Sequence, residues 1–339
     1  MRDDVFNRRV VLAAHPRGDV RPDDLAVVRD PLPALTEGRF RVRNRWLSVD
    51  PMIRLFIDAK PMGAIPVMPP GTTIPGAAVG EVVETLHPDF AMGTIVEGRF
   101  GWQDYALSDG TGVRRVDPAI GPIEQALGIY GLPGFSAYAG LDVIGGVAAG
   151  QTVLVSGAAG AVGSAAGALA ASRGARVIGI ASGAAKAQWL IDEIGYAAVV
   201  DRGAPDFAAA LDAALPDGVD LYFDNVGGPL MMQVADRMNR NGRILVCGLM
   251  AQYGGGGADD RDRLPDFLSA IMGRTLTVRA FVNVAHEALR PAFLDEMRAL
   301  VAQRPALAQI HVTVGLEKTP AAFAKLFESG VTGKRLVRI

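Results

Sequence analysis

The chain has few of the residues that build disulfides and metal clusters. Its 339 residues include one cysteine, Cys247, and four scattered histidines, His15, His87, His286 and His311. A single cysteine cannot form an intramolecular disulfide, and this set provides neither a four-cysteine structural zinc site nor a cysteine–histidine catalytic one. The sequence therefore predicts no bound metal and a chemistry that works without one.

Long apolar runs and an excess of charge are also missing. The longest apolar stretch, around Gly157–Ala171, consists largely of glycine and alanine and lacks the character of a membrane span. The first residues, MRDDVFNRRVVLA, are charged and do not resemble a secretory signal. The net charge of −2 provides no basic excess for nucleic acid. We therefore expect a cytoplasmic protein that binds neither membranes nor nucleic acids.

Hydrophobic residues make up 50% of the chain, enough for more than one domain core. Before Pro122 the pattern is rich in strands. Phe40–Asp50 alternates polar and apolar residues, and Gly76–Leu86 and Gly93–Asp109 are further strand candidates. The proline- and glycine-rich stretch Lys60–Gly76 is predicted to be a loop. This portion is typical of a small barrel or sandwich.

After Pro122 the pattern changes to an alternation of apolar strands and helices. Helical spacing interrupted by GLPG occupies Ile123–Gly146. Strands are expected at Val153–Ser156, Arg176–Ala181, Ala198–Asp201, Val219–Asn225 and Arg243–Leu249, and helices at Ala161–Ser172, Ala184–Ile194, Phe207–Leu215 and Leu230–Met238. Such alternation predicts an α/β fold with a doubly wound parallel sheet covered by helices on both faces. The tail after Pro305 reads as strand, helix, strand and is expected to return to the first domain.

A glycine-rich turn, SGAAGAVGS, joins the first strand of this alternation to an alanine-rich helix. Ala158–Gly163 reads A-x-G-x-x-G, with Ala158 in place of the usual first glycine. Gly160 lets the backbone approach phosphates, and Gly163 lets the helix pack closely on the strand. The helix N-terminus then offers N–H groups to a pyrophosphate. Because the motif lies between a strand and a helix, a bound dinucleotide is favoured over a packing turn without a ligand.

The end of the second strand distinguishes NADPH from NADH. An NAD site usually carries an acidic residue there, but this strand ends in Ser182 and Gly183. Lys186 follows on the next helix, and Arg202 follows the third strand. Two cations and a hydroxyl suit a 2′-phosphate, although Lys186 by itself is equally compatible with a solvated helix lysine. The sequence therefore predicts NADPH.

Several segments together resemble the zinc-independent medium-chain reductases, and more narrowly the leukotriene B4 12-hydroxydehydrogenase/prostaglandin reductase family. They are, in chain order, Trp46–Arg54, His87–Gly110, Gly131–Leu141, Val155–Ser164, Phe223–Gly228 and Cys247–Tyr253. The resemblance implies a GroES-like β-barrel domain over residues 1–127 and 300–339 and a Rossmann domain over residues 128–299. It also implies a homodimer and NADPH-dependent reduction of the α,β-double bond of enones and 2-alkenals, the activity of family members that reduce curcumin.

Motif and resemblance together nominate a set of cofactor-binding residues, all in the second half of the chain. They are Ala159, Gly160, Ala161, Val162, Gly163, Ser182, Lys186, Arg202, Asn225, Cys247, Gly248, Phe281 and Val282. Asn225 also lies at the carboxyl end of a predicted strand, where ligands bind in open α/β sheets. Three positions depart from the family pattern. Arg202 replaces a tyrosine near the adenosine phosphate, Met52 replaces a tyrosine near the entrance, and Val331 replaces an asparagine that contacts the cofactor.

Tyr253 is the catalytic candidate, matching a family tyrosine near the nicotinamide and the substrate. A phenol remains protonated at neutral pH and can donate to a carbonyl oxygen on which charge develops. The alternative is an aromatic lid over the cofactor, moved by the glycines at 254–257. Cys247 is interpreted as a small apolar filler rather than a nucleophile, and Trp102 and Tyr105 as barrel packing. Two other functions remain open, a quinone reductase on the same scaffold and a non-catalytic NADPH-binding protein.

Overall fold

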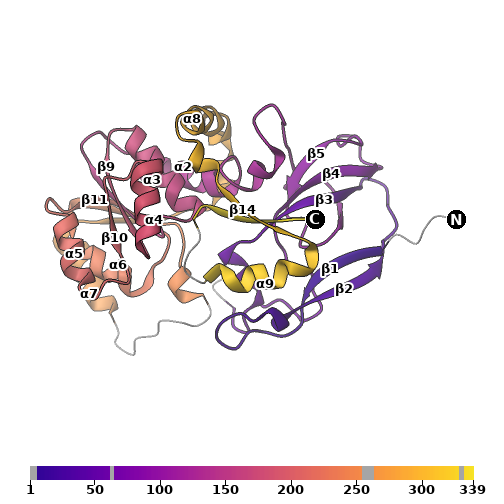
Figure 1. The fold of residues 1–339 in the computed structure, drawn as a ribbon, viewed down its shortest axis with the longest axis horizontal. Coiled ribbons are helices and arrows are strands. Elements are labelled where there is room, and N and C mark those ends of the chain that lie inside the picture. The colour runs from indigo at the N-terminus through magenta and orange to yellow at the C-terminus, as the bar shows by residue number, and fades with distance from the viewer. Residues whose placement is uncertain (1–5, 62–64, 254–262, 328–331) are drawn as a thin grey trace. The chain divides into compact units, whose positions relative to one another are not determined.

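Two sheets of different construction account for the two patterns in the sequence. The computed structural model describes residues 6–61, 65–253, 263–327 and 332–339 (Figure 1). The chain divides into two compact units. The first consists of Met1–Leu127, Ile310–Glu328 and Arg335–Ile339, and the second of Gly128–Gln309 and Ser329–Lys334. The boundary expected at residue 300 lies inside helix α8, Arg290–Gln303, which belongs entirely to the second unit.

The described part of the first unit holds a seven-stranded sheet in the order β14-β15-β3-β4-β5-β7, with β6 paired to β3, and a two-stranded sheet β1-β2. The strands are β1 Phe6–Leu12, β2 Leu25–Pro31, β3 Phe40–Ser48, β4 Ala78–Thr85, β5 Ile95–Gly98, β6 Tyr105–Ser108, β7 Arg114–Arg115, β14 Ile310–Val314 and β15 Lys334–Arg338. Its helices include α1 Arg54–Ile57, η3 Ile123–Leu127 and α9 Thr319–Ala324. The tail strands β14 and β15 therefore complete the sheet of the first unit, as the sequence predicted.

Trp102 lies at the centre of the first unit. Its side chain is 0% exposed, and its indole Nε1 donates to the Ser48 carbonyl oxygen over 2.9 Å. Its ring meets Phe323 of α9 edge to face at 5.4 Å. A Cβ on Gly76 would lie 2.1 Å from the indole nitrogen, so glycine is required beside the ring. The prediction that Trp102 packs the barrel is confirmed.

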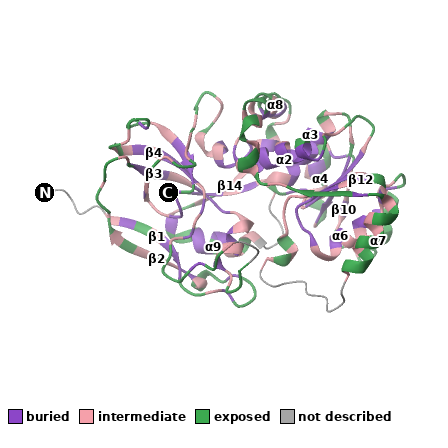
Figure 2. Ribbon diagram, turned by 180° about the vertical axis from the view of Figure 1, so that it is seen from behind, coloured by how far each residue is buried: buried purple, intermediate pink, exposed green. Residues whose placement is uncertain are grey.

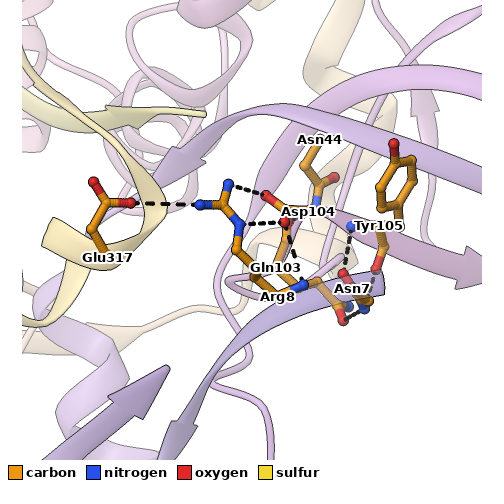
Figure 3. Close-up of polar contacts among 7 residues, drawn as sticks. All are labelled: Asn7, Arg8, Asn44, Gln103, Asp104, Tyr105 and Glu317. Atoms are coloured by element: carbon orange, nitrogen blue, oxygen red, sulfur yellow. Dashed lines mark hydrogen bonds and ion pairs between the residues drawn. The ribbon is translucent and has the colours of Figure 1, made fainter. Parts of the chain in front are cut away.

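Polar side chains fasten strand β1 to the segment before β6. Figure 3 shows the contacts among Asn7, Arg8, Asn44, Gln103, Asp104, Tyr105 and Glu317. The Arg8 guanidinium donates to Asp104 at 2.7 Å, and this hydrogen bond is the main cause that raises the pKa of Arg8. The Asn7 amide donates to the Gln103 side chain and to the Tyr105 carbonyl, both at 3.0 Å. These contacts tie β1 and β6 together inside the first unit.

The described part of the second unit forms a six-stranded sheet in the order β10-β9-β8-β11-β12-β13, in which neighbouring strands are parallel. The strands are β8 Thr152–Ser156, β9 Arg176–Ala181, β10 Ala198–Asp201, β11 Val219–Asp224, β12 Met238–Val246 and β13 Thr277–Ala280. The helices are α2 Leu132–Val143, α3 Ala161–Ser172, α4 Ala184–Trp189 with the π-helix η4 Leu190–Ile194, α5 Phe207–Ala214, α6 Gly228–Ala235, α7 Leu264–Arg274 and α8.

The helices cover both faces of this sheet. Residues of α2, α3, η4 and α8 share one apolar core with β8, and residues of α5, α6 and α7 share another with the opposite face. The central strand β8 is buried along its whole length. Helix α7, by contrast, has no buried residue (Figure 2). The predicted α/β fold with a doubly wound parallel sheet is confirmed.

The junction between α6 and β12 was predicted wrongly. The sequence predicted a helix to Met238 and a strand from Arg243, but α6 ends at Ala235 and β12 already begins at Met238. The polar run after Met238 has the composition of a turn. The backbone instead stays in the sheet, with Met238 beside Val219, and absorbs the extra length as an irregularity at Asn241, whose φ is 62°. Pairing with a neighbouring strand overrides the local turn composition here.

Candidate functional site

The order of the strands marks where a ligand fits in the second unit. From β8 the chain moves to β9 and β10 on one side, and then crosses to β11, β12 and β13 on the other. The switch point therefore lies between the carboxyl ends of β8 and β11. In open α/β sheets a crevice forms at such a point and receives the ligand.

The glycine-rich turn follows β8 directly at this switch point. Gly160 is the exposed residue that precedes α3, and the first N–H groups of that helix have no carbonyl partner within the helix. A Cβ built on Gly160 would touch one atom, the Gly157 carbonyl oxygen, at 3.4 Å. A Cβ on Gly163 would lie 2.4 Å from the same oxygen. Gly163 is therefore needed for packing, whereas among the described residues a Cβ on Gly160 would meet only one atom, which leaves room for the backbone to be approached by a phosphate.

The other sequence-predicted residues also lie at the carboxyl edge of the sheet. They are Ala159–Gly163 after β8, Ser182 and Lys186 after β9, Arg202 after β10, Asn225 after β11, Cys247, Gly248 and Tyr253 after β12, and Phe281 and Val282 after β13. The edge is about 24 Å wide at the usual spacing between strands. Along this edge, Lys186 and Arg202 lie on the β9–β10 side and Tyr253 lies on the β12 side.

The backbone brings Arg202 next to the end of β9, because its N–H donates to the Ala181 carbonyl oxygen at 2.8 Å. Arg202 is exposed and Lys186 is half-buried. Asp201, which the sequence reasoning did not consider, is an acid on the strand beside β9. Hydrogen bonds from the Gly203 and Gly183 N–H groups lower the pKa of the Asp201 carboxyl. The Asp201 carboxylate thus accepts hydrogen bonds from the backbone of the turns after β9 and β10.

Asn225 is buried and joins the ends of β8 and β11. Its side-chain Nδ2 donates to the Ser156 carbonyl oxygen at 2.7 Å, and its backbone N–H donates to Ser156 Oγ at 2.9 Å. The neighbouring Asp224 is fully buried. Sequence reasoning selected Asn225 and missed Ser156 and Asp224, although both lie in the quoted motifs.

Cys247 and Tyr253 lie beyond the end of β12. Burial, followed by the charge of Asp224, raises the pKa of the Cys247 thiol to about 12. A thiol in this state is not a nucleophile near neutral pH. Tyr253 is half-buried and follows the short helix η5, Met250–Gln252. Burial is the largest cause that raises the pKa of the Tyr253 phenol, which therefore carries its proton at neutral pH. The glycines at 254–257, expected to move a lid, lie outside the described residues.

The two candidates after β13 differ in their surroundings. Phe281 packs against α2, where a Cβ on Gly140 would lie 3.1 Å from its ring, and it meets His286 at 6.3 Å. Val282 is 69% exposed.

The C-terminal segment that follows Val331, which the family resemblance associates with the cofactor, also reaches the glycine-rich turn. The Gly333 N–H donates to the Ala159 carbonyl oxygen at 2.9 Å, and Gly333 forms a bridge with Gly160. Gly333 has a φ of +68°, and a Cβ there would lie 2.5 Å from the Gln309 carbonyl oxygen. Glycine is thus required where this segment passes the turn. Val331, the departure from the family pattern, lies outside the described residues.

Among residues 6–61, 65–253, 263–327 and 332–339, no group of three His, Cys, Asp or Glu side chains is arranged to hold a metal ion. No helix in the described part of the chain has both the length and the apolar character needed to cross a membrane.

Comparisons with known proteins agree with this geometry. Residues 8–116 match the family model described as the N-terminal domain of oxidoreductase, and residues 161–297 match the model described as zinc-binding dehydrogenase. The NADPH-dependent curcumin reductase of Escherichia coli (strain K12) is 34% identical, over 98% of this chain and 97% of that protein. Prostaglandin reductase 1 of Mus musculus is 35% identical, over 91% of each.

A solved structure is similar over nearly the whole chain. CurA from Vibrio vulnificus in complex with NADPH has a TM-score of 0.87 and 33% identity, over 98% of each chain. The two family models cover both units, and the sequence relatives extend across the junction between them. The chain belongs to the medium-chain dehydrogenase/reductase superfamily, in the family of the curcumin and prostaglandin reductases.

Proposed function

We propose that this chain is an NADPH-dependent reductase that saturates the α,β-double bond of enones and 2-alkenals. The observation that carries the proposal is the open position beside Gly160, where a Cβ would meet one atom of the described residues. That space lies at the N-terminus of α3 and at the switch point of the sheet. Relatives that are 34% and 35% identical are named as an NADPH-dependent curcumin reductase and a prostaglandin reductase.

The cofactor would lie along the carboxyl edge of the sheet in the second unit. Backbone N–H groups at the start of α3 receive the pyrophosphate. Lys186 and Arg202 receive the 2′-phosphate, and Asn225, Cys247 and the residues around them receive the nicotinamide end. We assign this orientation of the cofactor because the two cations lie on the β9–β10 side and the phenol of Tyr253 lies on the β12 side. Each of these residue roles is part of the proposal.

When bound, NADPH would supply a hydride to the β-carbon of the substrate. The negative charge that then collects on the carbonyl oxygen would be stabilised by a positioned donor, which lowers the barrier. A proton from solvent or a hydroxyl group would reach the α-carbon and complete the saturation of the double bond. Tyr253 is the proposed donor, because burial keeps its phenol protonated. The Cys247 thiol, whose pKa is raised to about 12, contributes packing and no nucleophile. One cysteine and four histidines do not supply a zinc site of the usual ligand sets, so the proposed reaction uses no zinc.

We also propose that the chain is a homodimer, located in the cytoplasm. Strand β13 is an edge strand of the second sheet, and all four of its residues are exposed. Exposed apolar side chains accompany it at Leu264, Leu268, Met272, Val278, Val282 and Val284. An uncovered edge with apolar neighbours favours pairing with a second copy. Analytical ultracentrifugation tests this, and a monomer at micromolar concentration would contradict it.

Tyr253→Phe is expected to lower turnover of an enone about tenfold or more, the scale of losing one donor to a developing oxyanion. The affinity for NADPH should stay within about twofold, because the phenol is proposed to act on the substrate. Since burial raises the pKa of Tyr253, its donor role should persist throughout neutral and mildly alkaline pH. Steady-state kinetics and NADPH titration measure both effects. Tyr105→Phe removes a phenol in the first unit and serves as the control. Unchanged turnover in Tyr253→Phe would remove Tyr253 from the chemistry.

A further inference from the structure

Asp224 is a carboxyl group without solvent contact at the end of β11. Its side chain is 0% exposed. One oxygen, Oδ1, accepts hydrogen bonds from Ser156 Oγ and the Tyr222 hydroxyl, both at 2.8 Å. The same oxygen accepts from the N–H groups of Val226 and Gly227, both at 2.9 Å. Four donors from two neighbouring strands and the following turn therefore converge on one atom.

Ser156 carries this contact across the switch point. Its hydroxyl donates to Asp224 and accepts from the Asn225 N–H. Ser156 is the last residue of β8, directly before Gly157 and the glycine-rich turn. On the other side, the Asp224 carbonyl oxygen accepts from the Cys247 N–H at 2.8 Å. One residue thus joins the ends of β8, β11 and β12.

A buried carboxyl group is a costly way to join three strands. It loses its hydration, and an apolar side chain of similar volume often serves stability as well. The second oxygen, Oδ2, is buried and has no hydrogen-bond partner among the described residues, so only one of the two oxygens is satisfied there. What Oδ1 does provide is an acceptor for the N–H groups of the turn after Asn225, where Gly227 has a φ of +68°. The carboxyl therefore defines the conformation of that turn.

We infer that Asp224, acting through Ser156, is a positioning residue that holds Asn225 and Cys247 in register with the glycine-rich turn, so that the nicotinamide half of the cofactor meets the substrate correctly. The inference rests on the proposed function, because it requires a dinucleotide on this edge. The hydrogen bonds of Ser156 and Asp224, called the tie below, connect β8, β11 and β12. They do not include β9 and β10, which precede Lys186 and Arg202. The effect of the tie should therefore fall on the nicotinamide half and spare the adenosine half.

The test compares Ser156→Ala and Asp224→Asn with the unchanged protein. Ser156→Ala removes the hydroxyl between the strands and leaves the other three donors on Asp224. Asp224→Asn keeps the shape and one acceptor oxygen. The expected result for Ser156→Ala is a kcat at least tenfold lower for an enone, with the Kd of the adenosine fragment 2′,5′-ADP unchanged within twofold. Asp224→Asn should show a loss of kcat in the same direction, again with 2′,5′-ADP binding retained.

Ser172→Ala is the matched control. Ser172 ends α3 at the end away from Gly160, and its hydroxyl donates to the Leu169 carbonyl oxygen at 2.9 Å. It also loses one serine hydroxyl in the second unit, so its kcat should match that of the unchanged protein. If Ser156→Ala weakens 2′,5′-ADP as much as it lowers kcat, the tie is general scaffolding and the inference is wrong. If Ser156→Ala and Asp224→Asn behave like the unchanged protein, the inference is also wrong, while the proposed function stands. If the unchanged protein binds neither NADPH nor 2′,5′-ADP, both fail.

Discussion

Gly160→Ala is expected to weaken NADPH binding at least tenfold, about 1.4 kcal/mol, without changing the temperature of unfolding. The added methyl group meets a single protein atom at 3.4 Å, which is ordinary contact, and the φ of −78° suits alanine. The protein therefore accommodates the change. The methyl group instead occupies the space where we propose that the pyrophosphate approaches the backbone. Isothermal titration with NADPH and thermal unfolding measure the two quantities in one preparation.

Two glycines of the second unit are the controls for this experiment. Gly163→Ala places a Cβ 2.4 Å from the Gly157 carbonyl oxygen, so it should lower stability together with binding. Gly273→Ala on α7 has nothing within 4 Å of its Cβ and should keep both properties. If Gly160→Ala binds NADPH as tightly as the unchanged protein, phosphates do not approach the backbone at this turn.

The double variant Lys186→Ala, Arg202→Ala is expected to weaken NADPH binding about a hundredfold, since charge-assisted hydrogen bonds contribute about 1.5–3 kcal/mol each. NADH lacks the 2′-phosphate, so its affinity should change less than about threefold. The reason is the placement of both residues at the β9–β10 side of the edge, with the Arg202 N–H bonded to the Ala181 carbonyl oxygen. Titration with each cofactor gives the ratio directly.

Arg176→Ala is the control for loss of a cation near the same strands. Arg176 begins β9 at the opposite edge of the sheet, where its guanidinium donates to the Ala214 carbonyl oxygen at 3.0 Å. It should leave the affinities for both cofactors unchanged. An equal loss of NADPH and NADH affinity in the double variant would show that Lys186 and Arg202 do not recognise the phosphate.

Most of the second unit was predictable because its signals are local. The helix Ala161–Ser172 and the strands Arg176–Ala181 and Ala198–Asp201 have the predicted bounds. The helix Ala161–Ser172 and the strand Arg176–Ala181 contain runs of buried side chains, and the short apolar strand Ala198–Asp201 ends in a polar residue. Strand β12 was predicted poorly because its first residues are polar and stay in the sheet through their pairing with β11. The sequence of β12 alone does not indicate that β11 will pair with it.

The same distinction explains which candidate site residues the sequence could nominate. Gly160 and Gly163 belong to a short motif with fixed spacing, and Asn225 lies at the end of a predicted strand, so these candidates came from the sequence alone. The tie between Ser156 and Asp224 joins residues 68 positions apart, and its meaning depends on β8 and β11 being neighbours. The contact of Gly333 with Ala159 depends on a C-terminal segment that returns to the second unit. These contacts could be recognised only once the order of the strands and the path of the chain were known.

The most direct test of the central claim is NADPH oxidation by the purified, chelator-treated protein, with identification of the product. The substrates are a long-chain 2-alkenal, a cyclic enone, curcumin and a simple quinone, with NADH run in parallel. The account predicts consumption of NADPH in preference to NADH and a product in which the carbonyl remains and the conjugated double bond is saturated. Turnover of the quinone alone, or tight NADPH binding with no turnover of any acceptor, would contradict it.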